Sequence, residues 1–323
     1  MKILKFLGLF LVPAVILAGA ALYEGDIPSD VVDARYSSPS SQFLDLGDAG
    51  RIHYRDDGNR RHPAVLLIHG SAASLHTFEP WVERLSGEYR VITLDLPGHG
   101  LTGAVPSADY SLAAYIDVVH ALANHLSLDT FVIGGNSMGG GVAWRYALAH
   151  PAQVRALVLI NATGLAKWRD DQTGNNTGNN SAVLVFELLR KPWFRAIAEK
   201  IDPYYLAQQG VTSAYNHSNV VDESLIMRYY DLNLRAGTRK ATIDRFQQFG
   251  QTPSADLSQI KTPTLVMWGQ EDALIPFSHA ARFEAAIPDT RTAYYRDVGH
   301  VPMEEIPDQS ARDLSVFLQA LNR

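Results

Sequence analysis

Short apolar segments alternate with longer amphipathic segments along most of the chain. This alternation predicts an α/β fold, a mostly parallel β-sheet with helices on both of its faces. The first two expected strands are separated only by the turn 47–50, so they predict a hairpin at one edge. The expected strands lie at 42–46, 51–55, 64–69, 90–94, 130–134, 154–160, 265–269 and 292–295. The expected helices of the core lie at 77–86, 111–126, 138–149 and 304–321.

The alternation stops between residues 164 and 251, where helical periodicity replaces it. An insertion at this point, after the sixth strand, predicts a helical lid above the sheet. The polar, asparagine-rich stretch 174–180 is typical of a hinge. The sequence therefore predicts an eight-stranded core in two parts, 41–163 and 252–323, with the lid at 164–251 between them. The expected lid helices lie at 182–189, 193–200, 224–234 and 239–249.

Aromatic side chains are frequent in the expected lid, and as a group they predict an apolar wall for a bound acyl group. Each of them could instead simply pack the lid onto the core, and for any single residue that interpretation is the simpler one. The substrate-binding candidates taken from this group are Phe186, Trp193 and Tyr229.

The first 24 residues have the pattern of a membrane-targeting segment. Lys2 and Lys5 precede an uncharged run, 6–23, and acidic residues follow it. Positive charge before such a run places the chain after it outside the cytoplasmic membrane. The run is just long enough to span the hydrocarbon core of a bilayer. The small residues at 18–20 also resemble the cleavage site of a secretory signal peptide.

The length of the run favours an uncleaved anchor over a signal peptide. An anchor predicts a folded domain on the periplasmic side of the cytoplasmic membrane, whereas cleavage would release a periplasmic or secreted protein. Residues 25–40 are polar and predict a linker between this segment and the core.

Composition limits the classes of partner and chemistry. With 46% hydrophobic and 19% charged residues among 323, the chain can bury a large core. A net charge of −6 without a basic patch argues against nucleic acid as a partner. The chain has no cysteine, which excludes thiol catalysis, disulfides and lipid attachment to cysteine. No cluster of His, Asp and Glu has convincing metal-binding spacing, so we expect no metal and no cofactor.

A candidate nucleophile lies between an expected strand and an expected helix. Residues 135–139 have the sequence GNSMG, with Ser137 at the centre. Strand, Gly-x-Ser-x-Gly and helix is the arrangement in which a serine lies on a tight turn with its hydroxyl exposed. Such a pentapeptide also arises by chance, so its interpretation depends on a base, an acid and an oxyanion donor elsewhere.

A base and an acid are both found on loops that follow expected strands. His300 lies beside a glycine after the last strand and is the best candidate for a base. Asp272 follows the preceding strand, where its carboxylate could orient the imidazole, and Glu271 is its local rival. The alternative position for the acid, one strand earlier, holds Asn161, which cannot be an anion.

The oxyanion hole needs two backbone N–H groups near the substrate carbonyl. One is expected from Met138, directly after the nucleophile. The other is expected from the loop that follows the buried strand 64–69, with Ser71 as first choice and Ala72 as the alternative. His69, at the start of this loop, is expected to pack beneath it.

Together these features resemble the α/β-hydrolase superfamily over about residues 41–322. The three candidates occur in the order serine, aspartate, histidine that this family uses. Residues 95–100 (DLPGHG) resemble the family's glycine-rich turn after the fourth strand. The resemblance implies the α/β-hydrolase fold and serine-based chemistry, with His99 in a structural role.

Departures from particular branches narrow the implied function. Dehalogenases and epoxide hydrolases of this fold use aspartate where this chain has Ser137, and residues 71–74 (SAAS) differ from the loops of proline iminopeptidases and carbon–carbon bond hydrolases. The resemblance therefore favours an esterase or lipase that acts on small-molecule esters with apolar acyl groups. Acyl transfer, perhydrolysis of the haloperoxidase type and non-catalytic binding remain alternatives, and the oligomeric state stays open.

Overall fold

The strands form one eight-stranded sheet in the order β1-β2-β4-β3-β5-β6-β7-β8. Their bounds are Ser41–Asp45 (β1), Arg51–Asp57 (β2), Ala64–Ile68 (β3), Arg90–Leu94 (β4), Phe131–Asn136 (β5), Val154–Ile160 (β6), Thr264–Gly269 (β7) and Thr290–Tyr295 (β8). β2 pairs antiparallel with β1 and β4, and every other pairing is parallel. The predicted mostly parallel sheet is confirmed. The computed structural model describes residues 23–165, 168, 191–216, 219–248 and 255–321.

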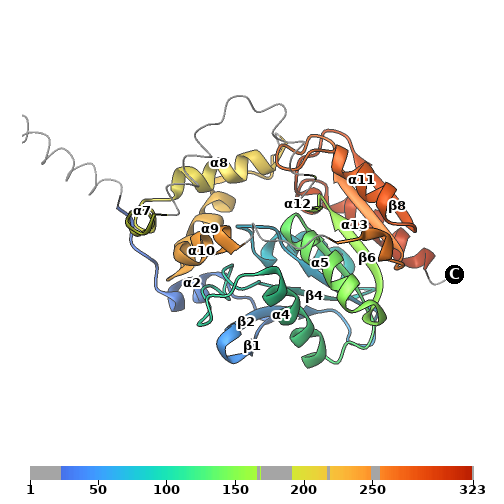
Figure 1. Cartoon of the computed structure of the whole chain (residues 1–323), viewed down its shortest axis with the longest axis horizontal. Helices are drawn as coiled ribbons and strands as arrows, with labels where there is room; N and C mark the ends of the chain where they lie inside the picture. Colours follow the sequence, from blue (N-terminus) through green and yellow to red (C-terminus); the bar gives the residue numbers. More distant parts are fainter. Residues whose placement is uncertain (1–22, 166–167, 169–190, 217–218, 249–254, 322–323) are drawn as a thin grey trace, which may run out of the picture.

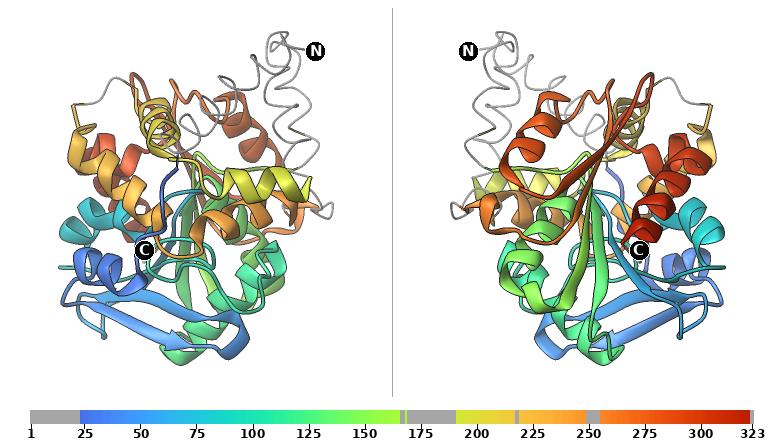
Figure 2. Two further views of the ribbon diagram at one scale, coloured as in Figure 1. Left: turned by 90° about the vertical axis from the view of Figure 1, so that its left-hand side faces the viewer. Right: turned by 90° about the vertical axis from the view of Figure 1, so that its right-hand side faces the viewer.

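Helices cover both faces of the sheet (Figures 1 and 2). One face carries α4 (Leu112–His125), α5 (Met138–Ala149) and α11 (Ser278–Ala286), and the other carries α3 (Glu79–Leu85) and α13 (Pro307–Ala320). Successive side chains of a strand point to opposite faces. The four apolar residues at the end of β3 therefore divide equally between two separate core clusters. Such strands are apolar throughout because both of their faces are buried.

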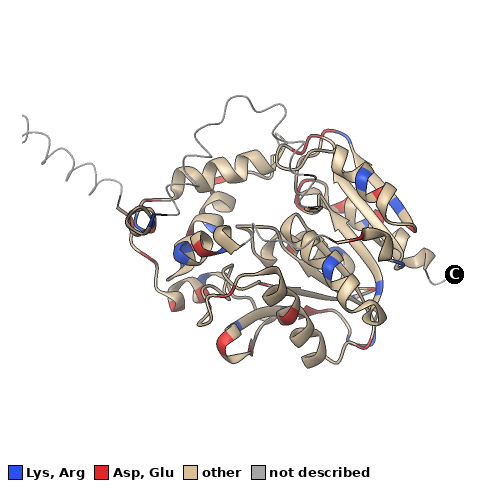
Figure 3. Ribbon diagram, in the orientation of Figure 1, with Lys and Arg blue, Asp and Glu red and all other residues tan. Residues whose placement is uncertain are grey.

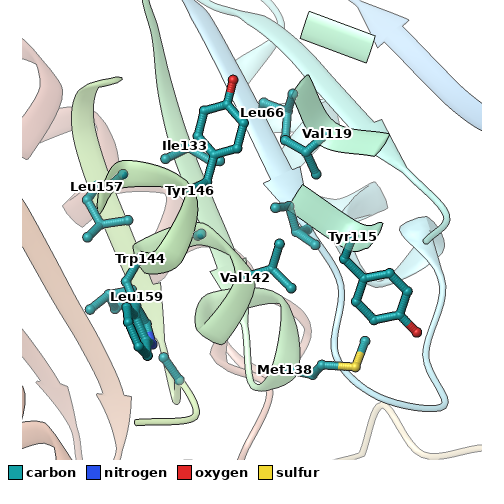
Figure 4. Close-up of a cluster of buried hydrophobic side chains, with 14 of the residues drawn as sticks. Leu66, Tyr115, Val119, Ile133, Met138, Val142, Trp144, Tyr146, Leu157 and Leu159 are labelled. Carbon is teal, nitrogen blue, oxygen red and sulfur yellow. The ribbon is translucent and has the colours of Figure 1, made fainter. Parts of the chain in front are cut away.

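Large buried side chains of α5 pack against the sheet. Trp144 and Tyr146 are fully buried, and the Trp144 indole N–H donates to the Thr163 carbonyl at 2.9 Å. Figure 4 shows side chains of α5 interleaved with those of β3, β5 and β6. Burial of each large apolar side chain contributes about 2 kcal/mol, so this packing holds the start of α5 firmly against the sheet.

The prediction of a single helix at 304–321 is wrong, because this segment of the chain forms two helices. α12 (Pro302–Glu305) ends at Glu305, and α13 begins at Pro307. Ile306 has φ −135° and ψ 55°, outside the helical region. A residue before proline is disfavoured in the helical region because its backbone meets the proline ring.

Four helices of the predicted lid are described, and they are α7 (Pro192–Ala198), α8 (Tyr204–Ala214), α9 (Glu223–Leu234) and α10 (Thr238–Gln248). Three of them match predicted helices. The sequence analysis did not predict α8, in which Val211 is the only buried residue. The predicted helix 182–189 and hinge 174–180 lie outside the described residues.

The segment predicted as a linker contains the helix α2 (Ser29–Tyr36), which docks on the lid helices. Asp33 accepts from Arg235 at 2.9 Å, and the Tyr36 hydroxyl donates to Asp231 at 2.7 Å. Figure 3 shows residues of both signs close together in this region. The sequence pattern did not indicate the helix because ion pairs dock it, and Val32 is its only buried apolar residue.

None of the helices in the described ranges is long and apolar enough to cross a membrane. The run 6–23, for which an anchor is predicted, lies outside those ranges except for Tyr23.

Gly139→Ala should destabilise the fold by about 3 kcal/mol, because an added methyl overpacks a rigid contact. A Cβ at Gly139 would lie 2.1 Å from the Ile68 carbonyl oxygen. The free energy of unfolding in urea measures the effect. The control is Gly210→Ala on the exposed side of α8, where no atom lies within 4 Å of the new Cβ. Helix propensity should make that change stabilising by about 0.5 kcal/mol, and equal effects at both positions would contradict the packing argument.

Candidate active site

Ser137 lies on a strained turn between β5 and α5. Its backbone has φ 53° and ψ −117°, a region that non-glycine residues rarely occupy. Such strain costs about 1–3 kcal/mol and persists only where the surroundings impose it. Gly135 permits the turn, since a Cβ there would lie 2.3 Å from the Gly139 carbonyl carbon. The side chain of Ser137 stays partly exposed among buried neighbours.

Hydrogen bonds from the neighbouring strand hold this turn in place. The Ser137 N–H donates to the Ile160 carbonyl at 2.9 Å. The Ser137 carbonyl accepts from the N–H groups of Thr163 at 2.9 Å and Gly141 at 3.1 Å. Both peptide groups of the serine are thereby satisfied, which leaves only its hydroxyl for chemistry.

The structure joins two of the predicted catalytic residues directly. His300 Nδ1 donates to Asp272 Oδ2 at 2.7 Å, and the two residues are only 5% and 9% exposed. A carboxylate can only accept in this bond, so Nδ1 carries the proton. The other nitrogen of the neutral ring, Nε2, is then free to act as a base.

Asp272 is held by three further donors. Its Oδ1 accepts from the N–H groups of Leu274 at 2.8 Å and Ile275 at 3.0 Å, and its Oδ2 accepts from Asn161 Nδ2 at 2.6 Å. The rival, Glu271, is exposed and contributes its backbone N–H to the Val298 carbonyl. Asn161, which occupies the alternative position for the acid, thus orients the Asp272 carboxylate toward His300.

The backbone of His300 is tied both to the nucleophile turn and to the lid. Its carbonyl accepts from the Asn136 side chain at 2.9 Å, one residue before Ser137. Its N–H donates to the Ala214 carbonyl, at the end of α8, at 2.7 Å. The Ser137 hydroxyl makes no hydrogen bond to a described residue. The contact needed for proton transfer therefore has to close in a complex with substrate, as is common at catalytic sites.

Glu305 is a site residue that the sequence analysis missed. Its Oε1 accepts from the Gly299 N–H at 2.9 Å and its Oε2 accepts from the Asn216 N–H at 3.0 Å. Burial raises the pKa of this carboxyl. A Cβ at Gly299 would lie 2.7 Å from the Ala214 carbonyl, so the lid and the histidine loop are in close contact. Its place near a helix start made Glu305 look like an ordinary first-turn carboxylate.

The predicted oxyanion loop lies against the nucleophile. A Cβ at Gly70 would be 3.2 Å from the Cβ of Ser137. Among the turn and loop bonds of the described residues, the Ser71 N–H donates to no acceptor. Met138 is the first residue of α5, where N–H groups have no partner within the helix. Ala72, the alternative donor, has a φ of 60°.

His69 has the packing role expected of it. Its Nδ1 donates to the Gly70 carbonyl at 2.7 Å, and its Nε2 accepts from the Leu96 N–H at 3.1 Å. Burial lowers the pKa of this imidazole. Both nitrogens are occupied, so the ring supports the loop and does not face the reacting groups.

Asp95 connects the oxyanion loop to the turn 95–100. The two carboxylate oxygens accept from the N–H groups of Leu75 at 2.7 Å and Leu101 at 2.8 Å, and from His53 Nδ1 at 2.7 Å. Burial alone would raise the pKa of Asp95, but the His53 hydrogen bond and charge hold it well below its usual range. His53 and Asp95 lie 42 positions apart in the sequence and meet because β2 pairs with β4.

The structure describes two of the three substrate-binding candidates. Phe186 lies outside the described residues. Trp193 on α7 is 60% exposed and packs edge-on against Phe194. Tyr229 on α9 is partly buried in the cluster that contains Tyr215. Their role in binding stays a prediction.

A separate polar cavity of about 730 Å³ lies between α2, α3 and α9. It is lined by Arg35, Arg55 and Arg228, each of which pairs with a carboxylate. Ser137 does not line it, so we do not assign it to the candidate active site. In the same described ranges, no group of three or more His, Asp and Glu side chains is placed to hold a metal ion.

Comparisons with known proteins identify the fold family. A family model described as "alpha/beta hydrolase fold" matches residues 63–307. Lipase 1 of Psychrobacter immobilis is 27% identical over 281 residues, which cover 86% of this chain and 84% of that protein. A 2-hydroxy-6-oxononadienedioate/2-hydroxy-6-oxononatrienedioate hydrolase of Klebsiella pneumoniae is 26% identical over 280 residues, covering 81% and 89%.

A solved structure, described as that of a membrane phospholipase A and a bacterial virulence factor, superposes with a TM-score of 0.70. It is 24% identical and covers 100% of this chain and 96% of that one. At this identity the similarity concerns the fold.

Glu305→Gln should slow covalent labelling of Ser137 by a fluorophosphonate about tenfold. An amide presents an N–H₂ group to one of the two N–H donors, which leaves the His300 loop poorly held. The labelling rate is followed by intact-protein mass spectrometry. Asp308→Asn, which changes an exposed carboxylate in the next helix, is the control and should label at the original rate. An unchanged rate in Glu305→Gln, in a protein of unchanged thermal stability, would show that this carboxylate does not position the histidine.

Proposed function

Because this chain belongs to the alpha/beta hydrolase fold family, we propose that it is a serine hydrolase that cleaves carboxylic esters through an acyl-enzyme. Ser137 is the nucleophile, His300 the base and Asp272 the residue that orients the base. The observation that carries the proposal is the 2.7 Å bond from His300 Nδ1 to a carboxylate whose other contacts are all donors.

In the first half of the reaction, His300 Nε2 takes the proton from Ser137 Oγ as the oxygen attacks the ester carbonyl. The carbonyl π electrons move onto oxygen, and the N–H groups of Met138 and Ser71 stabilise the oxyanion. The tetrahedral intermediate then expels the alcohol, which takes the proton from Nε2. The acyl group remains on Ser137.

In the second half, His300 Nε2 takes a proton from water, and the resulting hydroxide attacks the acyl carbonyl. The same two N–H groups stabilise the second oxyanion. Collapse of this intermediate returns the proton to Ser137 Oγ and releases the carboxylic acid. Asp272 stays ionised throughout and stabilises the imidazolium formed in each half.

Carboxylic esters are the proposed substrates for two reasons. Relatives named as lipases align with most of this chain, including Lipase 3 of Moraxella sp., which is 26% identical over 284 residues. The described lid also carries partly buried tyrosines, such as Tyr229, and these favour an apolar acyl group. The relative from Klebsiella pneumoniae makes carbon–carbon bond hydrolysis the competing outcome.

Hydrolysis of p-nitrophenyl esters from acetyl to palmitoyl, by the purified full-length chain, tests the proposal. Ser137→Ala should lower kcat at least a thousandfold, because the acyl-enzyme cannot form. Ser107→Ala, which removes an exposed hydroxyl, is the matched control and should hydrolyse every ester as before. The preferred chain length then reports the size of the acyl site.

Two results would argue against an esterase. Equal hydrolysis by Ser137→Ala would show that another group is the nucleophile. Turnover of a 2-hydroxy-6-oxodienoate together with inertness toward every ester would assign the triad to carbon–carbon bond cleavage.

We further propose that residues 1–22 anchor the enzyme to the cytoplasmic membrane with the active site on the periplasmic side. The charges around the run 6–23 support this orientation. The chain enters the described fold beside the lid, where Tyr23 pairs with Ile201 and the Glu24 N–H donates to the Lys200 carbonyl at 2.9 Å. An anchor attached there would keep the lid close to the bilayer.

Cell fractionation tests the anchor. The full chain should sediment with membranes and resist a high-salt wash, because an 18-residue apolar run holds it in the hydrocarbon. A variant lacking residues 1–22 should be soluble. A soluble full-length product whose N-terminus begins after residue 20 would instead identify a cleaved signal peptide.

A further inference from the structure

Arg245 is a buried cation of the described lid. It lies near the end of α10, is 1% exposed and forms no ion pair with a described residue. Burying an unpaired charge is expensive, because the surrounding protein replaces its hydration poorly. Such a group needs an explanation from the site that surrounds it.

The other buried arginines of the described chain each form an ion pair with a carboxylate. Arg55 pairs with Glu79 at 2.8 Å, Arg90 with Asp56 at 2.8 Å and Arg235 with Asp33 at 2.9 Å. Arg239, on the same helix as Arg245, pairs with Asp26 at 2.5 Å. Among the buried arginines of the described ranges, Arg245 alone lacks such a partner.

The groups around Arg245 are neutral. Its Nη1 contacts His99 Nε2, and the guanidinium also hydrogen-bonds with the neutral Tyr115 side chain. His99 Nδ1 lies 3.1 Å from the Pro97 carbonyl and donates to it, so Nε2 is the acceptor. Burial and the charges of Arg245 and His69 hold the pKa of His99 well below its usual value. The imidazole therefore provides no negative charge and adds no positive charge.

The charge lies beside the start of α5, next to the proposed oxyanion hole. Arg245 Nη1 is 4.0 Å from Met138 Sδ. Figure 4 shows the Met138 side chain extending from the first turn of α5 toward Tyr115. One methionine side chain thus separates the guanidinium from the backbone N–H that is proposed to bind the oxyanion.

We propose that Arg245 stabilises the oxyanion of the tetrahedral intermediate through space, as a fixed positive charge that never touches the substrate. This inference rests on the proposed ester hydrolysis. The anion that would balance Arg245 is absent from its surroundings in the described chain, and it forms on the substrate oxygen only as the serine attacks.

This role is distinct from that of the backbone donors. The positive charge stabilises a neutral ester carbonyl only slightly. It stabilises the oxyanion much more, because the site is buried and has a low dielectric constant. An interaction present only in the transition state raises kcat and leaves KM unchanged. The guanidinium is preorganised, because the packing of α10 on the core fixes its position before the substrate binds.

The test replaces the charge with a neutral chain of similar shape. Arg245→Met should lower kcat for neutral p-nitrophenyl esters about tenfold, with KM changed less than twofold. Affinity for a trifluoromethyl ketone, which forms a stable oxyanion adduct with the serine, should fall by a similar factor. The melting temperature should stay the same or rise, because an unpaired buried charge is removed. Arg245→Lys keeps the charge and should retain most of kcat, and Arg245→Gln provides a second neutral variant if the methionine variant does not fold.

Arg239→Met is the matched control on the same helix. It leaves Asp26 unpaired, so it should lower the melting temperature while kcat changes less than twofold.

Each other outcome overturns the inference in a recognisable way. Unchanged kcat in Arg245→Met and Arg245→Gln, with esters still hydrolysed through Ser137, shows that the charge has no part in catalysis. A loss confined to KM for esters with an acidic acyl group shows that Arg245 binds a substrate anion instead. A loss of kcat that Arg245→Lys shares, with an equal fall in melting temperature, assigns a packing role. Absence of ester hydrolysis by the unmodified protein overturns the proposed function, and this inference with it.

Discussion

The close approach of α5 to the sheet is the constraint on which the rest of the site depends. Gly139 lies directly against the end of β3, and Gly135 lies against Gly139. Only this spacing lets Ser137 occupy its positive-φ turn, with the first N–H groups of α5 aimed outward. The carboxyl ends of β3, β5, β7 and β8 then converge, which brings the oxyanion loop, the nucleophile, Asp272 and His300 to one edge of the sheet.

Buried charge is handled in two opposite ways around this edge. Asp272 and Asp95 are surrounded by donors, so each carboxylate is held in one orientation. Arg245 has no anion beside it among the described residues. The two carboxylates stabilise the resting arrangement, whereas the role proposed for Arg245 is to stabilise a negative charge that develops only on the substrate.

The predicted α/β fold and the positions of its strands agree with the structure because both are set by local patterns. Apolar runs of strand length, and glycines where strand meets helix, specify these elements without reference to distant residues. The predictions of secondary structure failed where a proline or an ion pair, and not the hydrophobic pattern, determined the local structure. Ile306 divides the last helix because it precedes a proline, and α2 was missed because it docks through ion pairs with α9 and the turn that follows it.

By itself, the sequence determined the fold class, the order of the elements and the identity of Ser137, Asp272 and His300 as candidates, since each lies in a recognisable stretch of contiguous residues. The tertiary structure alone decided which carboxylate faces the imidazole and how the histidine loop is attached to the lid. It also decided that Arg245 lies beside Met138. The residues in these contacts can lie more than a hundred positions apart, as with Asn161 and Asp272 or Arg245 and Met138. No local pattern of hydrophobicity or propensity specifies such pairs, because only the packing of the folded chain brings them together.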